Sequence, residues 1–293
     1  MRCDLHVHTR HSGMCTIPLL SKSCRESYNN PGEVYEILKR RGMNLVTVTD
    51  HDSIDSVESL RRHNDFFLSE EVTCTTPSGT EIHVGVYGIE ERHHIELQRR
   101  RADVPALAAY LHEQEIFFSI NHVFSSLTGR RTQLDFDLFD ELFPAIETLN
   151  GQIPSANNEA AARLALEWHK AVVGGSDAHT LSSLGETFTE VPGARDVKSF
   201  LHGLRCGNAR TVGTSGDYFK LTRAISRIGF EFVRETGWAA ALAPLFFVAP
   251  IVTLVHYVCE VAFRAKWSGR VLGGQPVRIP VTDPLLEVTD VRQ

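Results

Sequence analysis

Short β-rich runs alternate with helical stretches over about the first 212 residues of this 293-residue chain, and this alternation limits the fold more than any other feature. Strands separated by helices are typical of βα units and of a mostly parallel sheet. The expected strands are 2–8, 44–49, 66–72, 81–87, 116–121, 145–149 and 171–175. The expected helices are 32–41, 53–63, 93–114, 135–142 and 155–169. About seven such units predict a barrel of the (β/α) type.

The composition of the chain changes after residue 214. Apolar residues at +3/+4 spacing predict an amphipathic helix over 218–232, and its basic residues lie mostly off the apolar side. Residues 236–259 then run for 24 residues without Asp, Glu, Lys or Arg, which is long enough for a helix to cross a bilayer. Pro244 and Pro250 interrupt helical hydrogen bonding inside this run. Two alternatives stay open for it: membrane attachment, which the basic helix would assist, and burial against the barrel or a second subunit.

Composition also limits the kinds of binding partner and the cellular location that we expect. A net charge of −6 and a pI near 6.2, without a stripe of aromatic and basic residues, lead us to expect no long nucleic acid as a partner. Six cysteines are scattered without a C-x-x-C pair, which indicates reduced thiols and not a disulfide framework. Asp4, His6 and His8 occupy the place of an apolar signal-peptide core. We therefore expect a cytoplasmic location, with membrane association through 236–259 as the exception.

The informative polar residues stand at the ends of the predicted strands. Residues two apart on a strand share a face, so Asp4, His6 and His8 are expected to point the same way. The carboxyl ends of the strands converge on one rim of a βα barrel, where six of the fourteen histidines and several carboxylates should therefore meet. Besides His6 and His8, the polar residues at this rim are Asp50, His51, Glu70, Glu71, His83, Asn121, His122, Asp177 and His179.

Imidazoles and carboxylates are natural ligands of Zn²⁺, Mn²⁺ and Fe²⁺. One H-x-H pair on a strand is a weak signal, and a lone His83 or His122 is more often a hydrogen-bonded, half-buried histidine than a ligand. Independent structural histidines have no reason to collect at one end of five separate strands, so the joint pattern predicts a metal cluster. The histidines expected at the solvated surface instead are His63, His93, His94, His112, His169 and His202.

Five motifs follow one another along the chain: His6-x-His8-Thr9, Thr49-Asp50-His51, Glu71 with His83 twelve residues later, His122, and Ser176-Asp177-Ala178-His179. In this order they resemble the successive motifs of the PHP (polymerase and histidinol phosphatase) superfamily, over roughly residues 1–212. The resemblance implies a distorted (β/α)7 barrel with two or three divalent metal ions (Zn, Mn or Fe), followed here by a helical, strongly apolar extension.

The same resemblance implies a set of metal ligands. One ion would take His6, His8, Glu71 and Asp177. A second would share Glu71 as a bridging carboxylate and add His83 and His122, and a third would use His51 and His179. Glu71 is preferred to Glu70 because Glu71-Val72-Thr73 fits the family's pattern of Glu, a hydrophobic residue, then Ser or Thr.

One position departs from the family pattern. Many phosphoesterase members have Ser-Asp-Gly shortly after the H-x-H-T motif, and that Asp helps to hold the third metal ion. This chain has His11-Ser12-Gly13, with Gly13 where the Asp would stand. His11 is either a substitute ligand or a solvated loop histidine, so the occupancy of the third site stays open.

Two divalent ions that share a carboxylate lower the pKa of a bridging water and hold a hydroxide beside a phosphate ester. The expected catalytic residues are Glu71, Asp177, His179 and His51, and either of these histidines could protonate the leaving oxygen if it is not metal-bound. Arg130 and Arg131, in the loop after His122, and more weakly Arg10, are expected to bind the phosphate. The alternative for the Arg130–Arg131 pair is a solvated basic loop.

The favoured function is a metal-dependent phosphoesterase (a phosphoric ester hydrolase) acting on a small phosphorylated molecule. Family precedents implied by the resemblance include histidinol phosphate and nucleoside 3′,5′-bisphosphates. The alternatives are an amidohydrolase-like C–N or C–O hydrolase on the same metal pair and a non-catalytic, metal-stabilised module. We expect a hydrolase barrel over 1–214, an amphipathic helix plus apolar segment over 215–268, and an irregular tail over 269–293.

Overall fold

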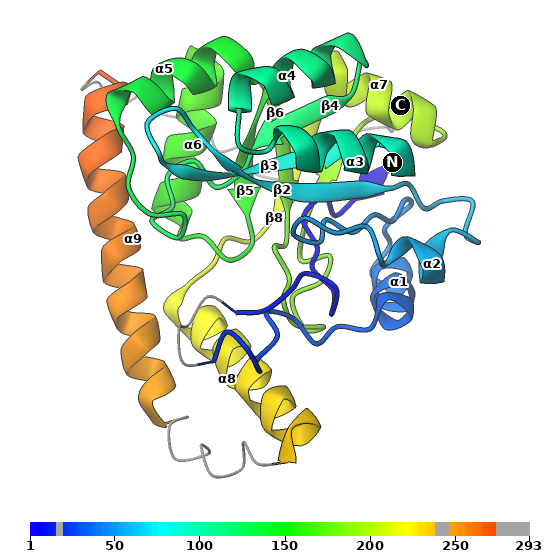
Figure 1. The fold of residues 1–293 in the computed structure, drawn as a ribbon, viewed down its shortest axis with the longest axis vertical. Coiled ribbons are helices and arrows are strands. Elements are labelled where there is room, and N and C mark those ends of the chain that lie inside the picture. Colours follow the sequence, from blue (N-terminus) through cyan, green and yellow to red (C-terminus); the bar gives the residue numbers. More distant parts are fainter. Residues whose placement is uncertain (16–19, 238–246, 274–293) are drawn as a thin grey trace, which may run out of the picture.

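A computed structural model of the chain describes residues 1–15, 20–237 and 247–273 (Figure 1). The strands are β1 (Arg2–Cys3), β2 (Ser69–Thr75), β3 (Glu81–Tyr87), β4 (Phe117–Ile120), β5 (Ala145–Asn150), β6 (Ala171–Gly175), β7 (Thr187–Glu190) and β8 (Arg210–Gly213). The helices are α1 (Pro31–Arg40), α2 (Val57–Leu60), α3 (Glu91–Arg100), α4 (Val104–Glu113), α5 (Gln133–Leu142), α6 (Ser155–Glu167), α7 (Val197–Arg205), α8 (Tyr218–Glu235) and α9 (Ala249–Val271).

The strands form two sheets. The larger sheet has the order β2-β3-β4-β5-β6 and is antiparallel from β2 to β4 and parallel from β4 to β6. Its core contains Val84 and Ile120 of the sheet together with Leu107 of α4, Phe136 of α5 and Leu164 of α6, so these three helices cover one face. The smaller sheet, β1-β7-β8, is antiparallel. The fold is therefore a mixed α/β fold.

The expected closed barrel does not form among the described residues. Only β4, β5 and β6 are parallel neighbours, because β2, β3 and β4 are joined as antiparallel strands. The space between β2 and β6 is crossed by residues 4–8 and 46–51, which form isolated bridges such as Val7 with Ala178 and His51 with Glu71.

Side chains explain why residues 4–8 form no continuous strand ladder. The Thr49 hydroxyl accepts a hydrogen bond from the Val7 amide at 3.0 Å, and an Asp4 carboxylate oxygen accepts from the Ser176 amide at 2.8 Å. Backbone N–H groups that would bond a neighbouring strand are thus satisfied by side chains. The expected strand 2–8 is reduced to Arg2–Cys3, and 44–49 forms no strand.

Other elements agree with the sequence to different degrees. The strands 81–87 and 171–175 are confirmed at the expected bounds. The expected helix 93–114 is two helices, because the Asp103 side chain caps α4 by accepting from the Ala106 amide and Pro105 lies in the first turn. The expected helix 53–63 is only the short α2. Strands β7 and β8 and helix α7 were not anticipated.

The helices α8 and α9 follow the second sheet. The amphipathic pattern correctly predicts α8, whose Phe232 is buried against Cys24. Helix α9 runs beside α6, and its Trp267 lies in the main core with ring contact to Phe136 (Figure 1).

Part of the apolar run 236–259 lies outside the described residues, as does most of the tail 269–293. Within the described part of α9, a carboxylate is buried: Glu260 is 1% exposed. Ile251, Leu254, Val255 and Val258, by contrast, are each more than half exposed. Across the described ranges, no helix combines the length and apolar character needed to cross a membrane. The strongly apolar character expected of the extension is therefore not confirmed.

Candidate metal centre

Glu71 on β2 stands at the middle of the histidine cluster, with its side chain fully buried. Its two carboxylate oxygens face different groups. Oε2 lies 3.1 Å from His6 Nε2 and 3.4 Å from His8 Nε2. Oε1 lies 3.5 Å from His83 Nδ1 and 3.4 Å from His122 Nε2. This division places one carboxylate between two candidate cation positions.

Asp177 completes the first group. Its Oδ1 lies 3.2 Å from His8 Nε2 and 3.5 Å from His6 Nε2. The residue follows β6 and has a left-handed backbone with φ +50°, an unfavourable conformation for a residue with a side chain. His122, after β4, has φ +30°. Backbone strain of this kind is concentrated at functional sites.

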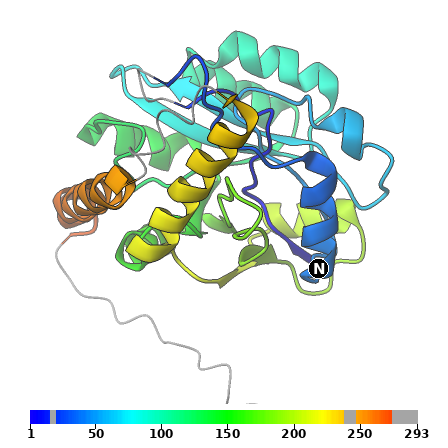
Figure 2. The ribbon, with the colours of Figure 1, turned by 90° about the horizontal axis from the view of Figure 1, so that it is seen from below.

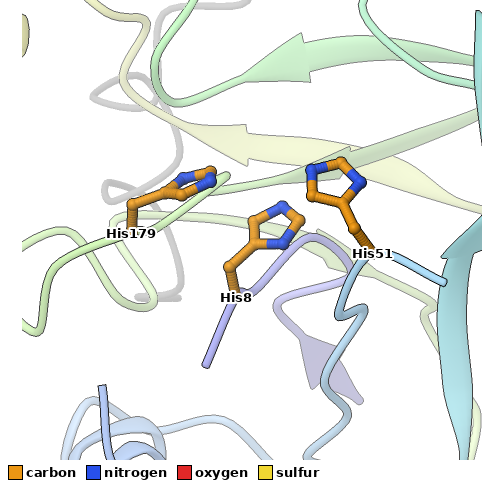
Figure 3. A group of neighbouring side chains, drawn as sticks. All are labelled: His8, His51 and His179. Carbon is orange, nitrogen blue, oxygen red and sulfur yellow. The ribbon is translucent and has the colours of Figure 1, made fainter. Parts of the chain in front are cut away.

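A third group lies toward the molecular surface. Figure 3 shows His8, His51 and His179, from three separate segments, with their rings close together. The ring centroids of His51 and His179 lie 4.7 and 4.3 Å from that of His8. Glu26 faces the same place: its carboxylate oxygens lie 3.8 Å from His51 Nε2 and 3.8 Å from His179 Nε2. A carboxylate therefore stands near the two histidines despite Gly13.

The chemistry of these donors fits metal ions. His8 Nε2, His51 Nδ1 and His83 Nδ1 are buried without a hydrogen-bond partner. Buried polar atoms are normally paired, so such unpaired nitrogens require an explanation. Each belongs to a group of side chains able to hold one ion. The groups are His6, His8 and Asp177; His6, Glu71 and His122; His51, Glu71 and His83; and His8, His51 and His179.

The electrostatics of the cluster agree with this interpretation. Burial raises the pKa of the Glu71 carboxyl, but His6, His51 and His83 outweigh burial and hold that pKa well below its usual range. Burial lowers the pKa of His51 well below its usual value, which favours the neutral imidazole that metal ions bind. Burial also lowers the pKa of His6, yet the carboxylates around it raise that pKa well above normal overall. The cluster thus attracts positive charge.

Several residues support the cluster, and of these Glu147 and Asn150 were not anticipated from the sequence. Glu147 on β5 lies 2.7 Å from His6 Nδ1 and accepts from the His122 amide at 2.9 Å. Asn150 donates to both Glu147 and Asp177, and Asn121 donates to Glu71 Oε1 at 2.8 Å. A carboxylate–histidine contact of this type fixes ring orientation and raises ligand basicity. The available signal was Glu147 within the mostly apolar strand 145–149 and Asn150 directly after it.

Close packing also fixes the position of His6. Gly175, at the end of β6, lies so near that an added Cβ would stand 2.3 Å from His6 N and 2.4 Å from His6 Cβ. Only glycine therefore allows the His6 segment to pass beside β6. Ser12 fixes the neighbouring ligand candidate, with its Oγ 2.7 Å from His8 Nδ1.

Not every rim residue enters the cluster. Asp4 accepts from the backbone amides of Ser176, Gly185 and His6, and its carboxylate does not enter the group of imidazoles. Glu70 faces away and contacts His94 Nδ1 at 2.5 Å. His11 faces Asp55 at 4.0 Å and belongs to none of the candidate groups. His93, expected at the surface, is 7% exposed and accepts from the Glu90 amide.

The three arginines expected to bind phosphate are not gathered at the cluster. Arg131 is buried, and its guanidinium donates to the Glu81 carbonyl and to Thr128 Oγ1. Arg10 pairs with Glu235 on α8 at 3.4 Å. Arg130 is exposed.

Comparisons with known proteins agree with the fold. A family model described as PHP-associated matches residues 155–209. An uncharacterized protein of Methanocaldococcus jannaschii is 31% identical over 67 residues, which span 22% of this chain and 38% of that protein. A two-domain protein from Bacteroides vulgatus, containing a predicted PHP-like metal-dependent phosphoesterase, shares the fold with a TM-score of 0.55 at 16% identity. That match covers 73% of this chain and 64% of the other.

PsfC from Pseudomonas syringae also has a TM-score of 0.55 at 16% identity, over 80% of this chain and 98% of its own. The PHP-associated match and the shared fold confirm the resemblance of the chain to the PHP superfamily.

The expectation that excluded long nucleic acids is wrong. Similar structures include the lesion-specific endonuclease Q of Pyrococcus furiosus and endonuclease Q with a 27-mer duplex bearing an abasic lesion. They are 16% and 15% identical to this chain, with TM-scores of 0.47 and 0.49. Each covers 73% of this chain, which spans 59% and 60% of theirs. Net charge describes a whole chain and not a local binding surface, so it cannot support that exclusion.

Proposed function

We propose that the chain is a metal-dependent phosphoesterase that hydrolyses a small phosphorylated molecule. The observation that carries the proposal is Glu71: its Oε2 faces the imidazoles of His6, His8 and His51, and its Oε1 faces those of His83 and His122. Buried nitrogens of His8 and His83 have no hydrogen-bond partner. A carboxylate shared between two cations would hold them close together, as two-metal hydrolysis needs.

The proposed ligands follow the three groups. His6, His8, Glu71 and Asp177 would hold one ion, and Glu71, His83 and His122 a second. His51 and His179 would hold a third together with Glu26, which we add to the set. Divalent ions bound there activate water and neutralise charge on phosphate oxygens.

The protein's own groups hold this arrangement in place. Glu147 fixes the ring of His6, and Asn121 and Asn150 fix the carboxylates of Glu71 and Asp177. Such rigid support keeps ligands in productive geometry before substrate arrives.

His179, whose side chain is 19% exposed, lines a surface cavity. We propose it as a ligand of the third ion or as the proton donor to the leaving oxygen. The metal stoichiometry of a His179→Gln variant separates these roles, since only a ligand role predicts the loss of one ion. Arg131 is left out of the proposed phosphate site because its donors are used within the fold.

The test is elemental analysis of the purified chain, combined with phosphate release from a panel of phosphomonoesters and diesters that includes abasic duplex DNA. We expect two or three divalent ions per chain and metal-dependent release. Glu71→Gln should lose metal and activity. Glu70→Gln is the matched control: it is the adjacent, equally buried carboxylate, but it faces His94. Wild-type turnover of Glu71→Gln would refute the bridging role, and bound metal without any ester hydrolysis would refute the function.

A further inference from the structure

A cavity of about 490 Å³ lies between helix α8 and the loop that carries His179. Figure 2 shows α8, in yellow, crossing this side of the molecule. One wall is formed by Arg223, Arg227, Glu231 and Arg234 of α8. The opposite wall includes Asn29, which is buried, and His179 of the candidate metal centre. The cavity therefore connects the metal centre to the helix.

The arginines of α8 share one helical face because they are spaced by four and seven residues. Glu231 pairs with Arg227 at 2.8 Å and with Arg234 at 2.9 Å, so one carboxylate holds two guanidinium groups at the cavity. In the described part of the chain, Arg223 forms no ion pair. Among the arginines of this wall, Arg223 is thus the one whose charge is not paired with a carboxylate of the described residues.

The charge of this cavity differs from that of the chain. Three arginines face two carboxylates, those of Glu33 and Glu231, while the whole chain carries a net charge of −6. A local excess of positive charge in a concave site attracts and orients anions. Guanidinium groups bind phosphates and carboxylates with a fixed geometry.

We propose that Arg223, supported by Arg227 and Arg234, binds a second anionic group on the substrate, while the scissile phosphate lies at the His179 end. This inference rests on the proposed function. The cavity volume is in the range of small-molecule sites and exceeds what a single phosphate needs. The substrate class is therefore a small phosphate ester with a further carboxylate or phosphate, and α8 determines specificity.

Two pairs of compounds test the proposal. Fructose 1,6-bisphosphate and fructose 6-phosphate differ by a phosphate, and 2-phosphoglycerate and glycerol 2-phosphate differ by a carboxylate. The metal-loaded protein and the variants Arg223→Ala and Arg223→Gln are compared by kcat/KM and by calorimetric binding of each compound. Arg205→Ala, an exposed arginine on α7 away from the cavity, is the control.

We expect the wild type to prefer the doubly anionic member of at least one pair. Arg223→Ala should reduce that preference roughly 10- to 100-fold, the value of one charge-assisted hydrogen bond, and leave the singly anionic member unchanged. The pair that responds identifies the second group. Equal effects on both members, or an equal effect of Arg205→Ala, would overturn the proposal.

The outcomes also separate this inference from the proposed function. An Arg223-dependent binding preference without phosphate release would support the anion site and refute the phosphoesterase. Phosphate release with no preference in either pair would refute the anion site alone. Cleavage of a single-stranded oligonucleotide that depends on Arg223, with no preference in either pair, would refute the assignment to a small substrate.

Discussion

Removing the carboxylate of Glu260 should destabilise the protein strongly. This residue of α9 is 1% exposed and reaches the loop that follows His122. It accepts from the Ser126 amide at 2.7 Å, from Ser126 Oγ at 2.6 Å and from Ser125 Oγ at 3.1 Å. In Glu260→Ala these three donors would lose an acceptor inside the protein. Each buried donor left unpaired costs about 1–3 kcal/mol, so the sum is at least about 3 kcal/mol.

The assay is urea unfolding followed by circular dichroism, together with the thermal midpoint. A loss of about 3 kcal/mol corresponds to a fall in Tm of roughly 6–12 °C for a chain of this size. Glu235→Ala is the control, because its pairs with Arg10 and Arg25 are half-exposed and should contribute less than about 1 kcal/mol. A loss below about 1 kcal/mol in Glu260→Ala would refute the docking of α9 on this loop.

Three further predictions follow from other contacts. Gly175→Ala forces a Cβ against His6, so it should lower the free energy of unfolding by about 1–3 kcal/mol and reduce the bound metal measured by elemental analysis. Gly269→Ala, with open space around it, should do neither. Asp135→Asn should cost about 2–3 kcal/mol at pH 7 in urea unfolding, because its carboxylate accepts from Thr76, Ser78 and Thr80. Burial raises the pKa of Asp135, but hydrogen bonds from Ser78, Thr132 and Thr76 lower it overall. The wild-type advantage should therefore exist above roughly pH 4 and decrease as the pH falls further, and an advantage that does not decrease on acidification would contradict this. Chelation of bound metal should lower the Tm by several degrees and re-addition should restore it, and an unchanged Tm would argue against ions at the buried cluster.

The sequence predicts which histidines come together more accurately than it predicts the fold. The structure brings five of the predicted histidines together: His6, His8, His51, His122 and His179. Each stands next to a segment whose apolar side chains are buried, and this burial fixes the direction in which the histidine side chain points. The alternation of side chains along a strand does not reveal that the Thr49 and Asp4 side chains replace backbone hydrogen bonds between strands. For this reason the closed barrel was wrongly expected.

Residues far from any motif were missed for a related reason. Glu26 belongs to no regular element, and only the tertiary fold brings its carboxylate within 3.8 Å of two histidines. The arginines of α8 were correctly placed on the polar side of a helix. Whether that side faces solvent, lipid or a cavity depends on how α8 packs, and periodicity does not contain this information.

The isolated bridges around residues 4–8 affect how well the protein resists proteolysis in the cell. The cluster joins residues 6, 71, 122 and 177, so an ion there acts as a cross-link that closes very long loops of the unfolded chain. In the chain-entropy model a covalent link closing about 100 residues is worth up to about 5 kcal/mol. Without that link, residues 4–8 are held by isolated bridges and side-chain hydrogen bonds instead of a continuous strand ladder. We therefore expect a metal-starved cell to lose this protein to proteolysis as well as to inactivity, so that its abundance follows the metal supply.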